Sequence, residues 1–204
     1  MSDPDHPNPE AQIRQFIAER LAGGFLSPEE IAEAALEYDE EIDTAVSGPI
    51  VERLLPDLIR EKLAAQATWP VVTDCDKLDA ALNELTKAGI VCRQNFTCCQ
   101  NCGFAEIGAE IEDEAARGIK PRGLAFYHQQ DTDGAAEGDG RHGLHLSFAA
   151  IAGDADHEPA ALRIAHEIVA TLASHGLTCD WDGTLGRRIA VNLNWQRRLF
   201  LPVP

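Results

Sequence analysis

The spacing of apolar residues changes near Trp69-Pro70, and this change constrains the fold more than any other feature of the chain. Before this point, apolar residues recur at helical spacing. After it, helical segments alternate with short runs in which apolar and polar residues alternate, the period of a half-buried strand. From Cys75 onward we predict the order α-β-α-β-β-α-β-β. The expected fold is α+β, with an N-terminal helical segment followed by a mainly antiparallel sheet that has helices packed on one face.

Composition divides the chain into three predicted parts. Residues 1–10 hold three prolines and no large apolar residue after Met1, so we expect a disordered tail. Residues 11–68 form an acidic helical segment, and residues 69–204 form the α+β domain. The strands of that domain are predicted at residues 90–96, 123–130, 142–149, 177–181 and 189–195.

The segment Cys92–Gly103 carries four of the six cysteines of the chain. Cys99 and Cys102 form a C-x-x-C pair, and Cys98 directly precedes it. The strand predicted upstream and the helical spacing downstream place these thiols on a strand-to-helix turn. A helix N-terminus favours thiolates, through its dipole and its free backbone N–H groups.

Three interpretations of this turn are open. The first is a zinc site, since two cysteines separated by two residues can reach one tetrahedral ion. Because no second C-x-x-C exists, the ligands would be Cys98, Cys99 and Cys102 with His128. Other candidates for the missing ligands are Cys92 and a histidine at position 142 or 145.

The second interpretation is dithiol redox chemistry, because C-x-x-C after a strand is typical of thioredoxin-like proteins. The order of the later elements does not match that fold. The third interpretation is packing, since cysteine is among the most buried residue types. Under this third interpretation, which the sequence favours, the thiols hold no metal and react slowly.

A second polar cluster surrounds His128, which is predicted to lie at the inward end of a strand. It would serve as a metal ligand or general base, with Asp131 or Asp133 orienting it. A structural histidine is the simpler alternative. The C-terminal end is locally basic, and its arginines are expected to meet the acidic N-terminal helices; they are Arg187, Arg188, Arg197 and Arg198.

The net charge of −17 excludes the usual electrostatic signature of a nucleic-acid-binding protein. It also disfavours binding to anionic membrane surfaces. Such charge suits a basic protein partner, or simply keeps a protein soluble. No stretch approaches the roughly 18 apolar residues of a transmembrane helix, and no signal peptide is visible. We therefore expect a cytoplasmic location and reduced thiols.

Three passages together carry a resemblance to a known family. They are residues 95–103 (NFTCCQNCG), residues 128–132 (HQQDT), and Gly176-Leu177 followed by Trp181-Asp182-Gly183-Thr184. The combination resembles an uncharacterised bacterial family, a domain of unknown function, over about Leu78 to Trp195. This resemblance implies a bacterial cytoplasmic protein and supplies no activity. Residues 161–184 are more weakly similar to the acidic bacterial protein that inhibits ribonuclease E, regulator B.

Two functions follow from these observations. The first is a small cytoplasmic binding or regulatory protein that acts through protein contacts, without a cofactor. The alternative is a thiol-based metal-binding or redox protein, or an enzyme, that uses the turn at Cys98, Cys99 and Cys102 with His128. The sequence leaves open whether the chain is an enzyme.

Overall fold

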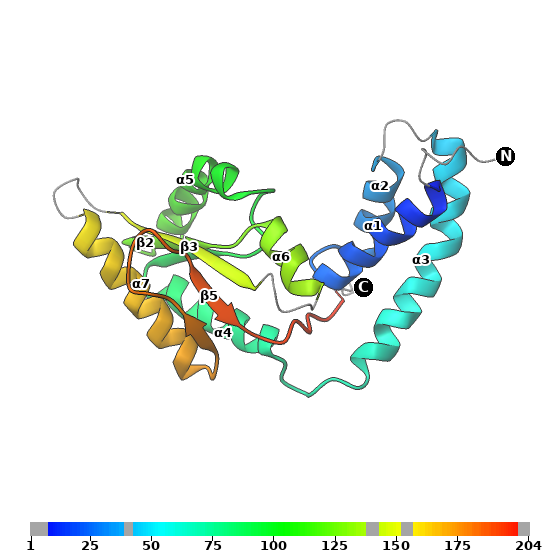
Figure 1. The fold of residues 1–204 in the computed structure, drawn as a ribbon. Helices are drawn as coiled ribbons and strands as arrows, with labels where there is room; N and C mark the ends of the chain where they lie inside the picture. The colour runs from blue at the N-terminus through cyan, green and yellow to red at the C-terminus, as the bar shows by residue number, and fades with distance from the viewer. Residues whose placement is uncertain (1–7, 39–42, 138–142, 152–156, 200–204) are drawn as a thin grey trace. The chain divides into compact units, whose positions relative to one another are not determined.

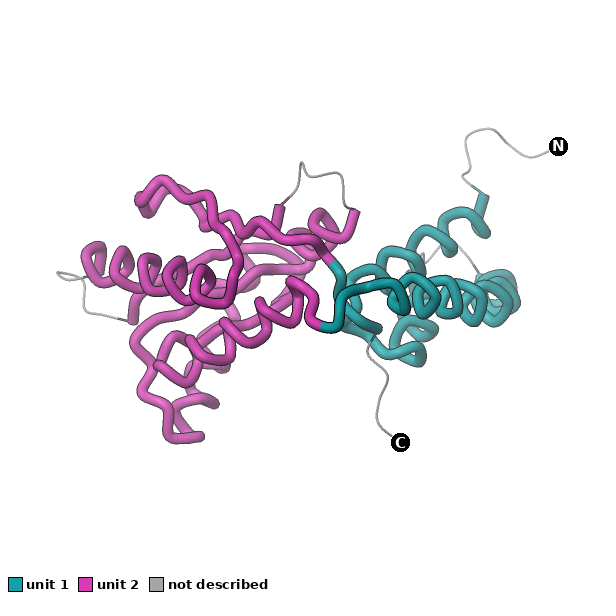
Figure 2. Tube along the Cα trace, turned by 90° about the horizontal axis from the view of Figure 1, so that it is seen from below, with its two compact units in different colours: residues 1–71, 196–204 teal, residues 72–195 magenta. Residues whose placement is uncertain are grey.

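The chain divides into two compact units in a computed structural model that describes residues 8–38, 43–137, 143–151 and 157–199. The first unit comprises residues 1–71 and 196–204, and the second comprises residues 72–195 (Figure 2). The α+β domain had been predicted over residues 69–204. The structure differs at its C-terminal end, because the segment from Gln196 packs with the first unit.

The first unit contains three helices, α1 (Pro9–Gly23), α2 (Pro28–Leu36) and α3 (Thr44–Gln66). Local capping explains where they begin. Ser27 accepts a hydrogen bond from the backbone N–H of Glu30, whose carboxylate accepts one from the N–H of Ser27. Because α1 begins at Pro9, the last residues of the predicted tail are helical. Residues 1–7 lie outside the described part.

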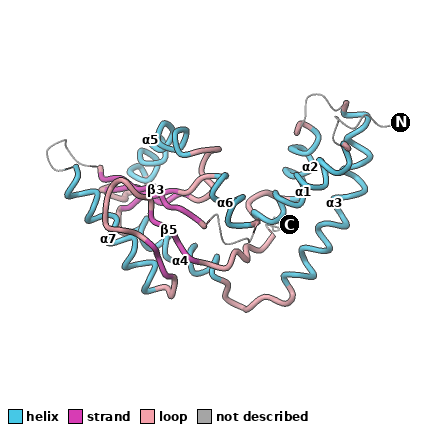
Figure 3. Tube along the Cα trace, viewed as in Figure 1, coloured by secondary structure: helices cyan, strands magenta, loops and turns pink. Residues whose placement is uncertain are grey.

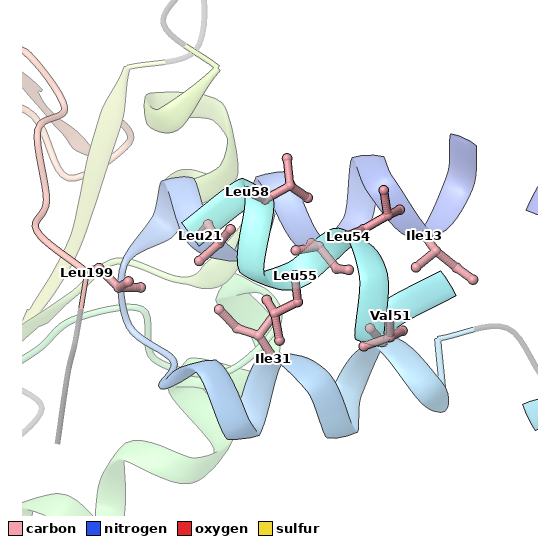
Figure 4. Close-up of a cluster of buried hydrophobic side chains, with 10 residues drawn as sticks. Ile13, Leu21, Ile31, Val51, Leu54, Leu55, Leu58 and Leu199 are labelled. Atoms are coloured by element: carbon pink, nitrogen blue, oxygen red, sulfur yellow. The ribbon is translucent and has the colours of Figure 1, made fainter. Parts of the chain in front are cut away.

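The core of this unit is built from aliphatic side chains on all three helices (Figure 4). Ile13 and Leu21 of α1, Ile31 of α2 and Leu54 of α3 are all buried in it. Leu199, from the far end of the chain, is buried in the same cluster, and its backbone N–H donates to the side chain of Gln66. This apolar contact attaches the C-terminal segment to the helical unit.

The second unit combines strands with surrounding helices in an α+β sandwich (Figure 3). Its sheet has five strands in the order β1-β2-β3-β5-β4. Strands β1 and β2 are parallel, and the other neighbours are antiparallel. The predicted α+β class is therefore confirmed. In chain order the elements are α4 (Asp74–Lys87), β1 (Ile90–Arg93), α5 (Gln100–Ala116), β2 (Gly123–Phe126), α6 (Gln129–Ala136), β3 (Leu144–Ala150), α7 (His157–Ser174), β4 (Thr178–Asp180) and β5 (Ile189–Asn192).

Helices cover both faces of this sheet, whereas the sequence had indicated one. Figure 1 shows α5 on one side of the strands, with α4 and α7 on the other. Alternation along β2 explains both layers, since Phe126 packs with Ile107 of α5. A Cβ at Gly123 would lie 2.6 Å from Ile164 of α7, so glycine permits close packing on that side. On the α5 side, Gly103 fits directly against the ring of Phe126.

Strands β1, β2 and β5 end three or four residues earlier than predicted, and β4 ends one residue earlier. β1 stops at Arg93 because Asn95 and Thr97 adopt positive φ values of 50° and 59°, which are incompatible with an extended strand. β2 stops at Phe126, and α6 replaces part of the predicted loop 131–141. The positions of that loop from 138 onward lie outside the described residues. No helix in the described ranges is both long and apolar enough to cross a membrane.

Candidate functional site

Backbone hydrogen bonds hold the loop between β1 and α5 against the chain that follows β2. The N–H of Phe96 donates to the carbonyl of Tyr127 at 2.9 Å, and the N–H of Gln129 donates to the carbonyl of Thr97 at 3.1 Å. The Tyr127 hydroxyl donates to Oε1 of Gln94 at 2.7 Å. Two of the three segments that carry the family resemblance, residues 95–103 and 128–132, are therefore bonded to each other.

The loop is strained where it approaches the thiols. Thr97 is β-branched and has a φ of 59°, a region that such residues rarely adopt. Residues held in such regions cost on the order of 1–3 kcal/mol each, and they cluster at functional sites. The Thr97 hydroxyl donates to the carbonyl of Cys99 at 3.1 Å, which helps to fix this conformation. The strained turn delivers Cys98 and Cys99 to the start of α5.

The Sγ atoms of Cys98, Cys99 and Cys102 all lie within 4.8 Å of one another. The sulfur atoms of Cys98 and Cys102 are 3.5 Å apart. Zinc–sulfur bonds of about 2.3 Å in a tetrahedral site place two sulfurs about 3.8 Å apart, so this spacing fits thiolates around one ion. Within the described residues, no other histidine, cysteine or carboxylate joins the group.

The three thiols are accessible, which the packing interpretation does not explain. Cys98 is exposed, and Cys99 and Cys102 are half-buried. Cys92, by contrast, is a buried residue of strand β1, and burial raises its pKa to about 12. Cys92 behaves as a packed thiol, and the other three do not.

Protonation differs between the thiols of the cluster. Cys99 is the N-cap residue of α5, and its pKa lies below the ordinary value, first because the backbone N–H of Cys102 favours the thiolate. In the thiol form, the side chain of Cys99 makes no capping hydrogen bond. The pKa of Cys102 is raised to about 11, because its proton is shared with the sulfurs of Cys98 and Cys99.

His128, the predicted fourth ligand, is not brought into the thiol group. It is the N-cap of α6, where its Nδ1 accepts from the backbone N–H of Asp131 at 3.3 Å. Its Nε2 lies 3.1 Å from Oδ2 of Asp131. The pKa of His128 is lowered, first because burial disfavours the charged ring. Both ring nitrogens are thus occupied, which fits the structural alternative.

Arg188 completes the cluster around His128, and the sequence had not indicated this role. Its guanidinium contacts the buried carboxylate of Asp131 through two bonds, Nη1–Oδ2 at 2.9 Å and Nη2–Oδ1 at 3.0 Å. Of the two carboxylates considered as partners of His128, Asp131 and Asp133, Asp131 contacts its ring. In the sequence, the only local sign of the contact between His128 and Asp131 was their spacing of three residues. This is the spacing of a capping box, with histidine as an unusual first residue.

Of the C-terminal arginines that were expected to meet the acidic helices, Arg187 and Arg188 pair with carboxylates of the second unit. Arg187 pairs with Asp180 at 2.8 Å, within the same unit as Arg188. In the helical unit, the guanidinium of Arg197 lies 4.4 Å from the centre of the Phe25 ring.

Comparison with known families covers nearly the whole chain. Residues 6–199 match the model of a domain of unknown function, DUF6891. The chain belongs to this family. The predicted membership of an uncharacterised family is thereby confirmed, while the weaker likeness to regulator B stays a prediction. No curated protein and no solved structure matches the chain.

Proposed function

We propose that the chain is a metal-binding protein whose site is the turn formed by Cys98, Cys99 and Cys102. The observation that carries the proposal is the mutual approach of three sulfur atoms within 4.8 Å, on an accessible turn. Thiolates prefer soft or borderline cations, and zinc is the first candidate.

The electrostatics of the turn support a cation. Three adjacent thiols repel one another once they ionise, and the raised pKa of Cys102 reflects its neighbours. A bound divalent ion removes this penalty, because a coordinating thiol is deprotonated outright. Binding should therefore release protons and weaken as pH falls.

Three cysteines leave one position of a tetrahedral ion open. An open position is typical of zinc sites that exchange ligands or activate a bound molecule, whereas structural sites are closed. His128 is a poor candidate for the fourth ligand, because Asp131 already contacts both of its ring nitrogens. We propose that solvent or a partner supplies the fourth ligand.

Elemental analysis tests the proposal directly. Protein purified under reducing conditions and incubated with zinc should retain about one equivalent after gel filtration. Cys98→Ser, Cys99→Ser and Cys102→Ser should each lower zinc affinity at least tenfold. Cys179→Ser is the matched control, because Cys179 lies on β4, outside the thiol group. Substoichiometric zinc, or equal losses in all four variants, would refute the site.

Dithiol redox chemistry is the second candidate, and the contrast between Cys99 and Cys102 favours it. The Cys99 thiolate would attack a substrate disulfide, form a mixed disulfide and release one substrate thiolate, which takes up a proton. Deprotonated Cys102 would then attack Cys99, release the second substrate thiol and close an internal disulfide. With metal removed, oxidised glutathione should link Cys99 to Cys102, as peptide mass mapping would reveal. Failure to form this bond removes the redox candidate alone.

The basic protein partner and the cytoplasmic location stay predictions. The partner is supported by the net charge of −17, and the location by the reduced state that a thiolate site requires. A pull-down at two salt concentrations tests the partner, because such a complex should weaken as ionic strength rises.

A further inference from the structure

A cavity of about 620 Å³ opens in the second unit where the ladder between β3 and β5 stops. Leu146 with Ile189 is the last paired position of these two strands. Ser147 of β3, the residues at 185–188 and Gln100 at the start of α5 line the space. Its volume falls in the range of small-molecule sites, about 300–1,000 Å³.

The buried hydroxyl of Ser147 is the reason to infer a ligand in this cavity. The residue is 1% exposed, and its hydroxyl finds no hydrogen-bond partner among the described residues. Burying a hydroxyl without a hydrogen-bond partner is unfavourable, and alanine at position 147 would avoid this cost. A ligand atom that accepts a hydrogen bond would satisfy it.

The lining of the cavity is cationic in a chain that is strongly acidic overall. Arg187 and Arg188 line it, each paired with a carboxylate that is outside the lining (Asp180 and Asp131), and no aspartate or glutamate is among the described lining residues. The carboxylate that holds Arg188 is buried, so it fixes the guanidinium without occupying the cavity wall. The start of α5 adds partial positive charge, because no side chain caps it.

The wall formed by residues 185–188 is held in place. The indole Nε1 of Trp181 donates to the carbonyls of Thr184 and Arg187, at 3.0 and 3.1 Å. Its ring packs edge-on against Phe148, with centroids 5.7 Å apart. The cavity is therefore largely formed before any ligand arrives.

We propose that this cavity binds a small organic anion, a carboxylate or phosphate group on an apolar or aromatic body. The cationic groups and the Ser147 hydroxyl hold the charged head. Phe104, Phe148 and Leu185 supply apolar surface for the body, and Phe104 and Leu185 are exposed in the free protein. None of the three thiols is among the described lining residues, so the proposal does not require a metal as a ligand for the anion.

Calorimetric titration with four probes tests the proposal. Benzoate and phenyl phosphate carry the two candidate heads, benzamide is the neutral counterpart, and inorganic phosphate lacks the body. At least one organic anion should bind one equivalent per chain, at least tenfold more tightly than benzamide and inorganic phosphate. The stronger of the two identifies the head. Equal affinity for benzamide, or no binding by either organic anion, would overturn the proposal.

Variants distinguish binding in this cavity from nonspecific electrostatic attraction of an anion. Ser147→Ala should weaken the anion about fivefold, by loss of one hydrogen bond, yet leave the thermal midpoint of the free protein unchanged or higher. Arg187→Gln should weaken binding at least as much, whereas Arg163→Gln, an exposed change on α7, should not. If Ser147→Ala fails to fold, the comparison of the two arginine variants decides. Equal effects of both arginine changes, or a lower midpoint in Ser147→Ala without weaker binding, contradict the assignment.

Discussion

Replacing Gly103 with alanine should destabilise the protein, although alanine is the better helix former. A Cβ at position 103 would lie 2.3 Å from Cε2 of Phe126, a distance that real Cβ atoms do not show. Phe126 is 0% exposed and cannot move aside without disturbing the sheet. Overpacking of this kind costs about 1–3 kcal/mol. The gain in helix propensity offsets at most about 1 kcal/mol.

Gly108 provides a matched control on the same helix. A Cβ there would meet nothing within 4 Å, so only the propensity term remains. Gly108→Ala should therefore raise the free energy of unfolding by about 0.5–1 kcal/mol, while Gly103→Ala should lower it by about 1–2 kcal/mol. Urea denaturation followed by circular dichroism measures both. If the two variants were equally stabilised, α5 would not pack against β2 as described.

Three further outcomes follow from the structure. Arg93 lowers the pKa of Glu114 in the folded protein. The pair therefore contributes stability above about pH 4.5, and this contribution is lost as the pH falls through the pKa of Glu114 in the folded state. Glu114→Gln should flatten that part of a curve of stability against pH. Near neutral pH in metal-free protein, a thiol probe should modify Cys99 well before Cys92, whose pKa is about 12; peptide mapping with time would show the reverse order if the assignment is wrong. Trp181→Ala should cost about 2–3 kcal/mol, somewhat less than a fully buried tryptophan, and an unchanged thermal midpoint would count against the loop contacts described.

Local sequence patterns predicted the features that depend on near neighbours. The capping residue Ser27 and the proline after it placed the start of α2 correctly. Alternating apolar residues placed the third strand, which the structure has at Leu144–Ala150. The strand-to-helix turn at Cys98 and Cys99 was also readable, because a short apolar run and a helical repeat flank it. Each of these signals lies within a few residues of the feature that it specifies.

The same patterns failed where an unusual residue takes a familiar role. His128 was assigned to a strand because it continues the alternation of Leu124 and Phe126. In the structure His128 caps α6, and the carboxylate of Asp131 accepts a hydrogen bond from the backbone N–H of His128 at 3.2 Å. Histidine is not among the preferred capping residues, so local propensity gave no warning.

The sequence by itself therefore determined the α+β class, most helices and the turn that carries the thiols, because caps and periodicity act between neighbouring residues. Only the tertiary structure decided which side chains meet across the fold. Asp131 and Arg188 are separated by 57 residues, and Leu199 reaches a core that begins at Ile13. Such contacts depend on the free energy of burying apolar surface and of pairing buried charges in the folded chain. A short segment of sequence carries no signal of either.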